Sequence, residues 1–329
     1  MRTGLLRAGI ATVLALTLAA VLLWAYVTQP LFYRTPANRT AADGSTLPAR
    51  LESHVRALCE QFAPRDYTHP DNLDRAAAYI RGELERAGGS LAEQPYEARG
   101  IEYRNVIASF GPDTPERIVV GAHYDVAGPL PGADDNASGV AGLIELGRML
   151  GRDAPAMRVE LVAYPLEEMP FSFTPYMGSA VHARSLEQRG IRVRAMFSLE
   201  MIGYFSDRPN SQEFPLRVLR AVYPSRGNFI AIVGKPGQTS IVRRVKQAMR
   251  AASPLPVHSI NAPRSIPGID FSDHMNYWDA GYQALMITDT AFYRNPHYHT
   301  ANDLPETLDY TRMAMVIQGV HAAVRTLER

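Results

Sequence analysis

Five side chains of types that bind metal ions lie at separated points along the chain, each at the end of an apolar run. They are His123, Asp135, Glu168, Glu200 and His299. A mixed set of imidazole and carboxylate groups suits zinc, and a carboxylate that bridges two ions suits a two-metal hydrolytic site. We therefore expect a metal centre where the fold brings these positions together.

Glu167 precedes the expected ligand Glu168 and is the candidate for proton transfer. Paired glutamates usually lie on a solvated helix face. This pair instead follows an apolar stretch and precedes Met-Pro-Phe-Ser-Phe. Two neighbouring carboxylates can divide the work when a metal keeps one ionised and the other accepts a proton. The sequence predicts this division, with Glu167 as the general base.

The segments around His123 and Asp135 each allow a structural and a chemical interpretation. Asp125 lies two residues after His123, where it can hold the second ring nitrogen and fix the tautomer. Residues 132–139 have the sequence Gly-Ala-Asp-Asp-Asn-Ala-Ser-Gly, and their Asp, Asn and Ser residues are typical of a turn with a helix cap. A carboxylate on such a turn, facing a histidine, also suits a bridging ligand. Each segment is a weak signal alone.

The last two expected ligands lie in different contexts. Glu200 sits inside the apolar run Phe-Ser-Leu-Glu-Met-Ile-Gly, where burial of a charge is costly unless it is paired or bound to metal. The segment Asn-Pro-His-Tyr-His-Thr offers two histidines, His297 and His299. One is expected to be a ligand and the other its neighbour.

Short apolar stretches alternate with amphipathic ones, which predicts an α/β fold with a central, mostly parallel mixed sheet and helices on both faces. Strands are expected over residues 103–110, 117–122, 158–164, 195–201, 228–233 and 282–288. Helices are expected over residues 47–62, 72–87, 138–150, 179–188, 239–252 and 310–327. Sites in open α/β sheets lie beyond the carboxyl ends of strands. His123, the Glu167–Glu168 pair and Glu200 all follow expected strands, so they should converge.

Composition narrows the function further. The 329 residues carry 34 basic and 33 acidic side chains, which gives a net charge of +1. This balance provides no positive electrostatic field that would attract nucleic acid. The single cysteine, Cys59, excludes an internal disulfide and a cysteine-based metal site. A hydrophobic content of 46% is typical of a globular protein with a sizeable core.

The N-terminus carries a membrane signal. Arg2 and Arg7 precede an uncharged apolar run over residues 8–27, which as a helix can cross a hydrocarbon core of about 30 Å. Trp24 and Tyr26 are expected at the interface, and the basic flank at the cytoplasmic side. An uncleaved anchor is favoured over a cleaved signal peptide, and either places the body on the periplasmic or extracellular side. We expect residues 1–27 as anchor or signal, 28–48 as linker and 49–329 as one domain.

Taken together, the segments resemble the M28 family of zinc exopeptidases over about residues 100–310. The matching strings occur in the family's order: His-Tyr-Asp, Gly-Ala-Asp-Asp-Asn-Ala-Ser-Gly, Glu-Glu, Met-Gly-Ser at 177–179, Leu-Glu-Met-Ile-Gly, Ser-Asp-His at 272–274 and Tyr-His-Thr. The resemblance implies a zinc exopeptidase fold and removal of N-terminal residues from peptides.

The resemblance also implies roles for single residues. His123 and Glu200 would complete one zinc site, Glu168 and His299 the other, and Asp135 would bridge the two ions. Glu167 is implied as the general base, Tyr298 as donor to the developing oxyanion and Asp125 as partner of His123. A cis peptide is implied between Asp135 and Asn136.

The chain departs from the family pattern at two places. Glu200 stands where the family often has Asp. The segment 169–177 is longer than in compact aminopeptidases, and a loop at the rim of the cleft and a plain surface loop are both open for it. Asp273 and His274 are expected near the site without binding zinc. A side-chain pocket and core packing are both open as roles for four aromatic residues, namely Tyr204, Phe271, Phe292 and Tyr293.

Two other functions are weighed against the peptidase. Glutaminyl cyclases share the zinc exopeptidase fold that the resemblance implies, but they work with one zinc ion and do not hydrolyse peptides. A non-catalytic ectodomain would be expected to lack ligands or the base, and all six positions are present here.

Overall fold

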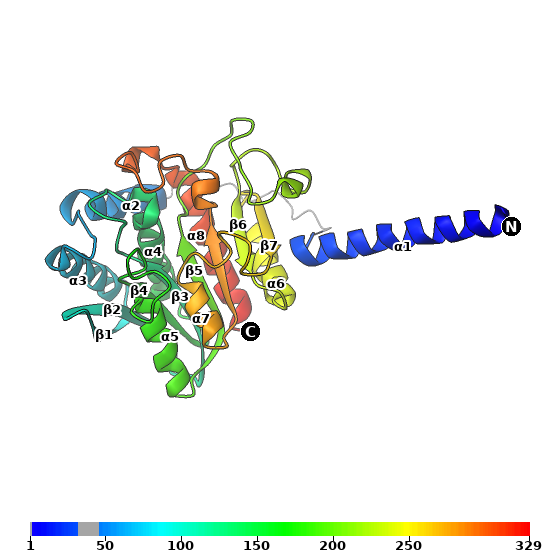
Figure 1. Ribbon diagram of the computed structural model, residues 1–329. Coiled ribbons are helices and arrows are strands. Elements are labelled where there is room, and N and C mark those ends of the chain that lie inside the picture. The colour runs from blue at the N-terminus through cyan, green and yellow to red at the C-terminus, as the bar shows by residue number, and fades with distance from the viewer. Residues whose placement is uncertain (1, 32–45) are drawn as a thin grey trace.

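The computed structural model describes residues 2–31 and 46–329 of the chain. Residues 32–45, the larger part of the linker predicted for 28–48, lie outside this description. The N-terminal helix α1 projects from one end of the α/β body (Figure 1). It covers Arg2–Thr28, and residues Ile10–Thr28 form a stretch apolar and long enough to cross a membrane.

One eight-stranded sheet forms the centre of the body, in the order β1-β2-β4-β3-β5-β8-β6-β7. Four of its seven pairings are parallel and three are antiparallel, which confirms the predicted mixed sheet. The strands are β1 (Ser90–Ala98), β2 (Ile101–Phe110), β3 (Glu116–His123), β4 (Arg158–Tyr164), β5 (Arg192–Glu200), β6 (Ile230–Gly234), β7 (Val257–Asn261) and β8 (Ala284–Thr288).

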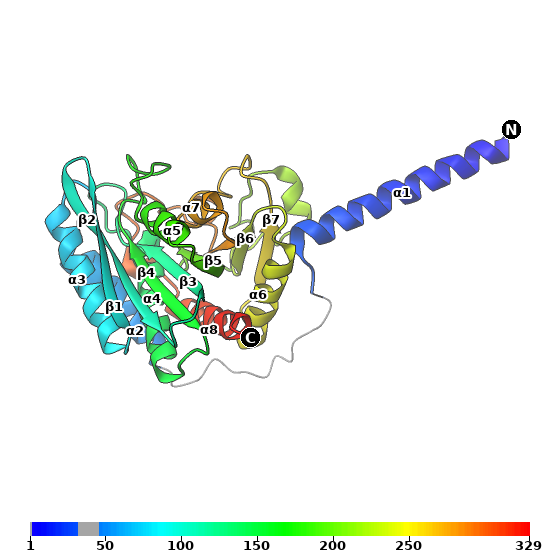
Figure 2. The ribbon, with the colours of Figure 1, turned by 90° about the horizontal axis from the view of Figure 1, so that it is seen from below.

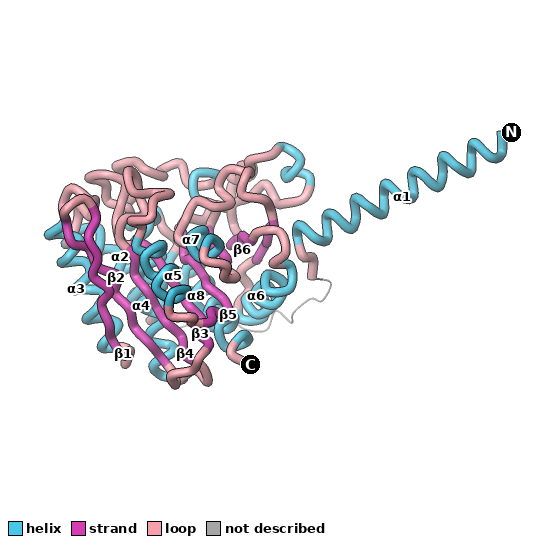
Figure 3. Tube along the Cα trace, turned by 60° about the horizontal axis from the view of Figure 1, so that its bottom comes forward, coloured by secondary structure: helices cyan, strands magenta, loops and turns pink. Residues whose placement is uncertain are grey.

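Helices cover both faces of the sheet. Helices α5 and α7 lie in front of it in Figure 3, and α4 and α8 lie behind, which agrees with the view in Figure 2. The helices of the body are α2 (Leu47–Arg56), α3 (Pro70–Arg86), α4 (Gly139–Arg152), α5 (Gly178–Gln188), α6 (Thr239–Ala252), α7 (His274–Asp279) and α8 (Tyr310–Leu327).

Alternation along the central strands divides the core into two layers. Ile118 and Val120 of β3 point into the larger cluster, which packs under α2, α3, α4, α6 and α8. Val119 points into the smaller cluster, together with Leu186 of α5 and Trp278 of α7. Successive side chains of a strand face opposite sides of the sheet, so an unbroken apolar run fits a strand that is buried on both faces.

Three elements were not predicted. Strand β1 is polar, contains Pro95 and is mostly exposed at the edge of the sheet, so it lacks the apolar signal of a buried strand. Strand β7 and helix α7 are only five and six residues long. The helix expected over 47–62 is regular only to Arg56 and continues as a wider helical turn over Ala57–Gln61.

The sheet order brings the expected strand ends together. Strand β3 lies between β4 and β5 and is parallel to both. It ends at His123, β5 ends at Glu200, and β4 ends three residues before Glu167. These positions therefore meet at one edge of the sheet, as expected for parallel strands.

A buried arginine ties the segment after β3 to the turn that follows. Arg65 is fully buried. Its Nε donates to the carbonyl of Tyr124 (3.0 Å), and its Nη1 and Nη2 donate to the carbonyls of Pro131 (3.2 Å) and Gly132 (3.1 Å). A further bond from Nη1 reaches the carbonyl of Leu58 (2.5 Å). Burial of a guanidinium is tolerated when its donors are satisfied in this way.

We predict that Arg65→Met lowers the free energy of unfolding by about 3 kcal/mol or more, because four backbone carbonyls, three of them in buried bonds, lose their donor. Urea unfolding followed by circular dichroism measures the change. Arg81→Met is the matched control, since Arg81 is half exposed and its ion pairs with Glu85 and Glu93 span 3.6 and 3.5 Å. The control should change stability by about 0.5 kcal/mol or less. Equal effects of both variants would contradict the structural role of Arg65.

Candidate metal centre

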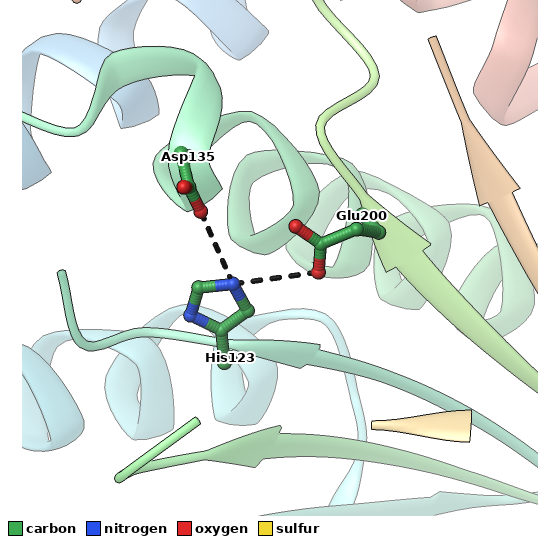
Figure 4. A group of neighbouring side chains, drawn as sticks. All are labelled: His123, Asp135 and Glu200. Atoms are coloured by element: carbon green, nitrogen blue, oxygen red, sulfur yellow. Dashed lines mark ion pairs between the residues drawn. The ribbon is translucent and has the colours of Figure 1, made fainter. Parts of the chain in front are cut away.

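His123 lies at the bottom of the site between two carboxylates. Its Nε2 is 3.3 Å from Oδ1 of Asp135 and 3.4 Å from Oε2 of Glu200, which come from the turn Ala133–Ser138 and from the end of β5 (Figure 4). The ring is fully buried, yet Nε2 makes no well-angled hydrogen bond with any described residue. A buried nitrogen of this kind, facing two carboxylates, suits a metal ligand.

A second group of ligand-type side chains shares Asp135 with the first. Nε2 of His299 is 2.9 Å from Oδ2 of Asp135 and 3.1 Å from Oε1 of Glu168. Within each group, one candidate atom per residue lies within 4.8 Å of the others. The two oxygens of Asp135 thus face different histidines. The peptide after it, Asp135–Asn136, is cis, as the resemblance implied.

The donors fit zinc. Each group combines one imidazole nitrogen with carboxylate oxygens, and the shared carboxylate offers one oxygen to each side. The structure therefore brings together all five side chains that the sequence singled out as ligands: His123, Asp135, Glu168, Glu200 and His299.

Asp125 holds the turn that carries both glutamates. Its two carboxylate oxygens accept the backbone N–H groups of Glu167 and Glu168, each at 3.1 Å. One of these oxygens is also 3.4 Å from Nδ1 of His123, and the backbone carbonyl of Asp125 is 3.2 Å from the same nitrogen. The expected contact with His123 is present, and the support for Glu167 and Glu168 is an additional role that the sequence did not reveal.

Asp303 supports the other turn in the same way and was given no role from the sequence. Its oxygens accept the N–H groups of Asp134 (2.9 Å) and Asp135 (3.1 Å). Burial raises the pKa of Asp303 to about 7. Its position in the Tyr-His-Thr-Ala-Asn-Asp segment was the only available signal, because its partners lie 168 and 169 residues away.

The Ser-Asp-His segment contacts the site from the side. The hydroxyl of Ser272 donates to Oε2 of Glu200 at 2.8 Å. Asp273 and His274 are fully buried and belong to neither ligand group. His297 also lies outside both groups, and its ring packs edge-on against Tyr204.

Glu167 lies beside His123 and belongs to neither ligand group. Its Oε2 is 4.0 Å from Nε2 of His123. Burial raises the pKa of Glu167 well above its usual range, His123 opposes this shift, and the charges of Glu168 and Glu200 add to it. A carboxylate with a raised pKa is suited to accept and release a proton near neutral pH.

An apolar pocket of about 110 Å³ adjoins the site. Glu200 and Tyr298 contribute to its wall. Phe271, Phe292 and Tyr293 line it, which favours the pocket over core packing for these three residues. Tyr204 instead packs in the larger core cluster. The ring of Tyr298 stacks on His299 with centroids 3.8 Å apart.

The long segment 169–177 reaches the rim of this pocket at one point. Phe173 is exposed and packs edge-on against Phe271, with ring centroids 5.7 Å apart. Phe171 is buried against Tyr67 and Tyr103 and fixes the base of the segment.

The model of peptidase family M28 matches residues 105–324, which include every expected ligand. This chain belongs to peptidase family M28. The family assignment, together with the fold, identifies a hydrolase of the peptidase class. It also agrees with the family resemblance of the sequence motifs.

Individual relatives add detail. The chain is 47% identical over 281 residues to the uncharacterized protein YfbL of Escherichia coli K12, covering 83% of this chain and 86% of the relative. Its fold resembles a zinc aminopeptidase of Bacillus subtilis (TM-score 0.66, 16% identity, 85% and 94% covered). It also resembles a glutaminyl cyclase of Bacteroides thetaiotaomicron (TM-score 0.63, 18% identity, 84% and 97% covered).

The histidines of the site are held in their charged form by the carboxylates. Burial lowers the pKa of His299, but the hydrogen bonds that its ring donates to Asp135 and Glu168 outweigh this effect and raise the value to about 10. Burial also lowers the pKa of His123, but the charges of Glu200 and Glu167 outweigh this effect and raise the pKa well above its usual value. Metal ligands must be unprotonated, so metal competes with these protons and gains affinity as the pH rises.

We predict that zinc binding at pH 8 releases about two protons per chain, because His123 and His299 must lose theirs. Titration calorimetry in buffers of different ionisation enthalpy measures the number. His299→Gln should lower it by about one proton. The control His69→Gln, at a largely exposed histidine outside both groups, should leave it unchanged. Binding without proton release would contradict the assignment of the two histidines as ligands.

Proposed function

We propose that this chain is a zinc-dependent aminopeptidase that hydrolyses the first peptide bond of its substrates with two zinc ions. His123 and Glu200 would hold one ion, Glu168 and His299 the other, and Asp135 both. The observation that carries the proposal is the orientation of Asp135, whose Oδ1 lies 3.3 Å from His123 and whose Oδ2 lies 2.9 Å from His299.

When bound, zinc lowers the pKa of water and polarises a carbonyl group as a Lewis acid. Glu167 would accept a proton from the attacking water at its carboxylate and return it to the leaving amine. The bond from its backbone N–H to Asp125 fixes the turn that aims this carboxylate. Asp125 acts as a positioning residue for both Glu167 and His123.

Tyr298 would donate its hydroxyl to the oxygen that gains charge during attack. Stacking on His299 fixes its ring beside the ligands. The pocket next to Tyr298 is lined by Phe271, Phe292 and other apolar side chains. It suits an apolar side chain at the N-terminal residue of the peptide.

We further propose that α1 is a membrane anchor and that residues 49–329 form one peptidase domain on the non-cytoplasmic side. The apolar stretch Ile10–Thr28 is exposed from Ile10 to Trp24 and long enough to cross a bilayer. Arg2 and Arg7 at its start favour the cytoplasm for the N-terminus.

We predict that Glu167→Gln lowers kcat on an aminoacyl amide by roughly 100-fold or more, because the general base is lost while the ligands remain. Steady-state kinetics with a leucyl amide measures the rate, and elemental analysis measures zinc. Glu102→Gln, at an exposed glutamate of β2, is the matched control and should retain full activity. A Glu167→Gln enzyme with full zinc and near-normal turnover would refute the role of Glu167, and an inactive wild type would favour a non-catalytic ectodomain.

The likeness to a glutaminyl cyclase structure makes a single-zinc acyltransferase the second candidate. The two reactions differ in metal content and product. We predict about two zinc ions per chain in the purified protein, measured by mass spectrometry of the elements, because two ligand groups share Asp135. One zinc per chain, with cyclisation of an N-terminal glutamine peptide and no hydrolysis of the amide, would favour the cyclase.

A further inference from the structure

The C-terminal end of α1 is buried against α6 and β7. Nζ of Lys246 on α6 donates to the backbone carbonyls of Thr28 (2.7 Å) and Gln29 (3.2 Å). Ser259 on β7 donates to the carbonyl of Thr28 at 2.8 Å and accepts from Lys246 at 3.0 Å. Tyr26 contributes a further bond, since its hydroxyl accepts the N–H of Gly237 at 2.9 Å.

These contacts make the end of α1 part of the folded body. The last carbonyls of a helix lack partners within the helix, and a lysine near that end satisfies them and complements the helix dipole. Lys246 is itself buried. Two of its three bonds go to Thr28 and Gln29. Without α1 this ammonium group would keep one of its three hydrogen-bond partners among the described residues, so the docking supports retention of the helix.

A second feature lies on the same side of the body. The segment 214–226 contains a short helix, Arg217–Ala221, drawn in yellow-green beside the inner end of α1 in Figures 1 and 2. Three apolar side chains of this segment are exposed: Leu216 (43%), Val218 (66%) and Val222 (38%). Arg217, Arg220 and Arg226 are exposed among them.

This combination suits the surface of a bilayer. Exposed apolar side chains can enter the boundary between headgroups and acyl chains, while arginines bind the phosphates of anionic lipids. Exposed apolar groups that lie together mark interaction surfaces. A bilayer is favoured over a protein partner as the occupant of this surface. If α1 crosses a bilayer, as proposed above, that bilayer lies next to the segment without any further binding event.

We propose that segment 214–226 rests on the surface of the bilayer that α1 spans, with Leu216, Val218 and Val222 in contact with lipid and the arginines at phosphate groups. The docked end of α1 fixes the orientation of the body, so the contact is built into the fold. This inference does not depend on zinc or on catalysis.

The contact would bear on the pocket of the candidate site. Phe214, Leu219 and Tyr223 belong to the same segment and line that pocket. The hydroxyl of Tyr223 donates to the carbonyl of Ser259 (2.7 Å), the residue that also binds the end of α1. One segment therefore joins the docked anchor, the exposed apolar face and the pocket wall.

The full chain in nanodiscs of phosphatidylcholine and phosphatidylglycerol tests the proposal. An environment-sensitive fluorophore is placed at Val218→Cys, or at Ile101→Cys as the matched control, both in a Cys59→Ala background. Ile101 is also a partly exposed apolar residue (38%), but it lies on β2, next to the edge strand β1 and at the other end of the sheet from β7. Lipids with a spin label near the headgroup then report contact.

We expect quenching at position 218 to exceed that at position 101 by roughly twofold or more, because only the former approaches lipid. Lys246→Met should reduce the difference while leaving position 101 unchanged, since it frees the end of α1. Equal quenching at both positions would overturn the proposal. So would preferential quenching at 218 by an aqueous reagent, or an intact mass showing that the mature chain begins after Gln29.

Discussion

The convergence of several carboxylates at one buried point is the constraint on which the rest of this site depends. Carboxylates lose hydration on burial and repel one another. Glu168 shows the effect, since burial and then the charge of Asp135 raise its pKa to about 7. Positive charge stabilises the group, whether carried by protonated His123 and His299 or by divalent cations. The arrangement is therefore specific for cationic partners.

The scaffold meets this constraint with buried groups that do not belong to the ligand set. Asp125 binds the backbone of the Glu167–Glu168 turn, and Asp303 binds the backbone of the Asp134–Asp135 turn. In both turns a carboxylate accepts two consecutive N–H groups, and the second of the two residues is a proposed metal ligand whose direction is fixed in this way. Ser272 holds Glu200 by a single hydroxyl bond. Such outer partners set the orientation of the ligands and tune their basicity.

The sequence predicted the parts of this arrangement that rest on local patterns. Unbroken apolar runs located β3, β4 and β5, and their ends located His123 and Glu200, because strand ends and ligands coincide in this fold class. Strand β1 escaped prediction because an exposed edge strand has no apolar pattern to detect. The roles of Asp303 and Arg65 were not predicted for a different reason. Their hydrogen-bond partners are distant in sequence, so the N–H groups bound by Asp303 and the carbonyls bound by Arg65 can be identified only in the folded chain.

The docked end of α1 would change what the proposed membrane anchor does for this protein. A helix joined only through a loose tether leaves the cleft free to turn in any direction. A helix whose last carbonyls are bonded to Lys246 and Ser259 holds β7 and α6 at a fixed angle to its axis. Because the pocket wall and the exposed apolar face share segment 214–226, the proposed membrane contact would couple the position of the body on the bilayer to the shape of the pocket.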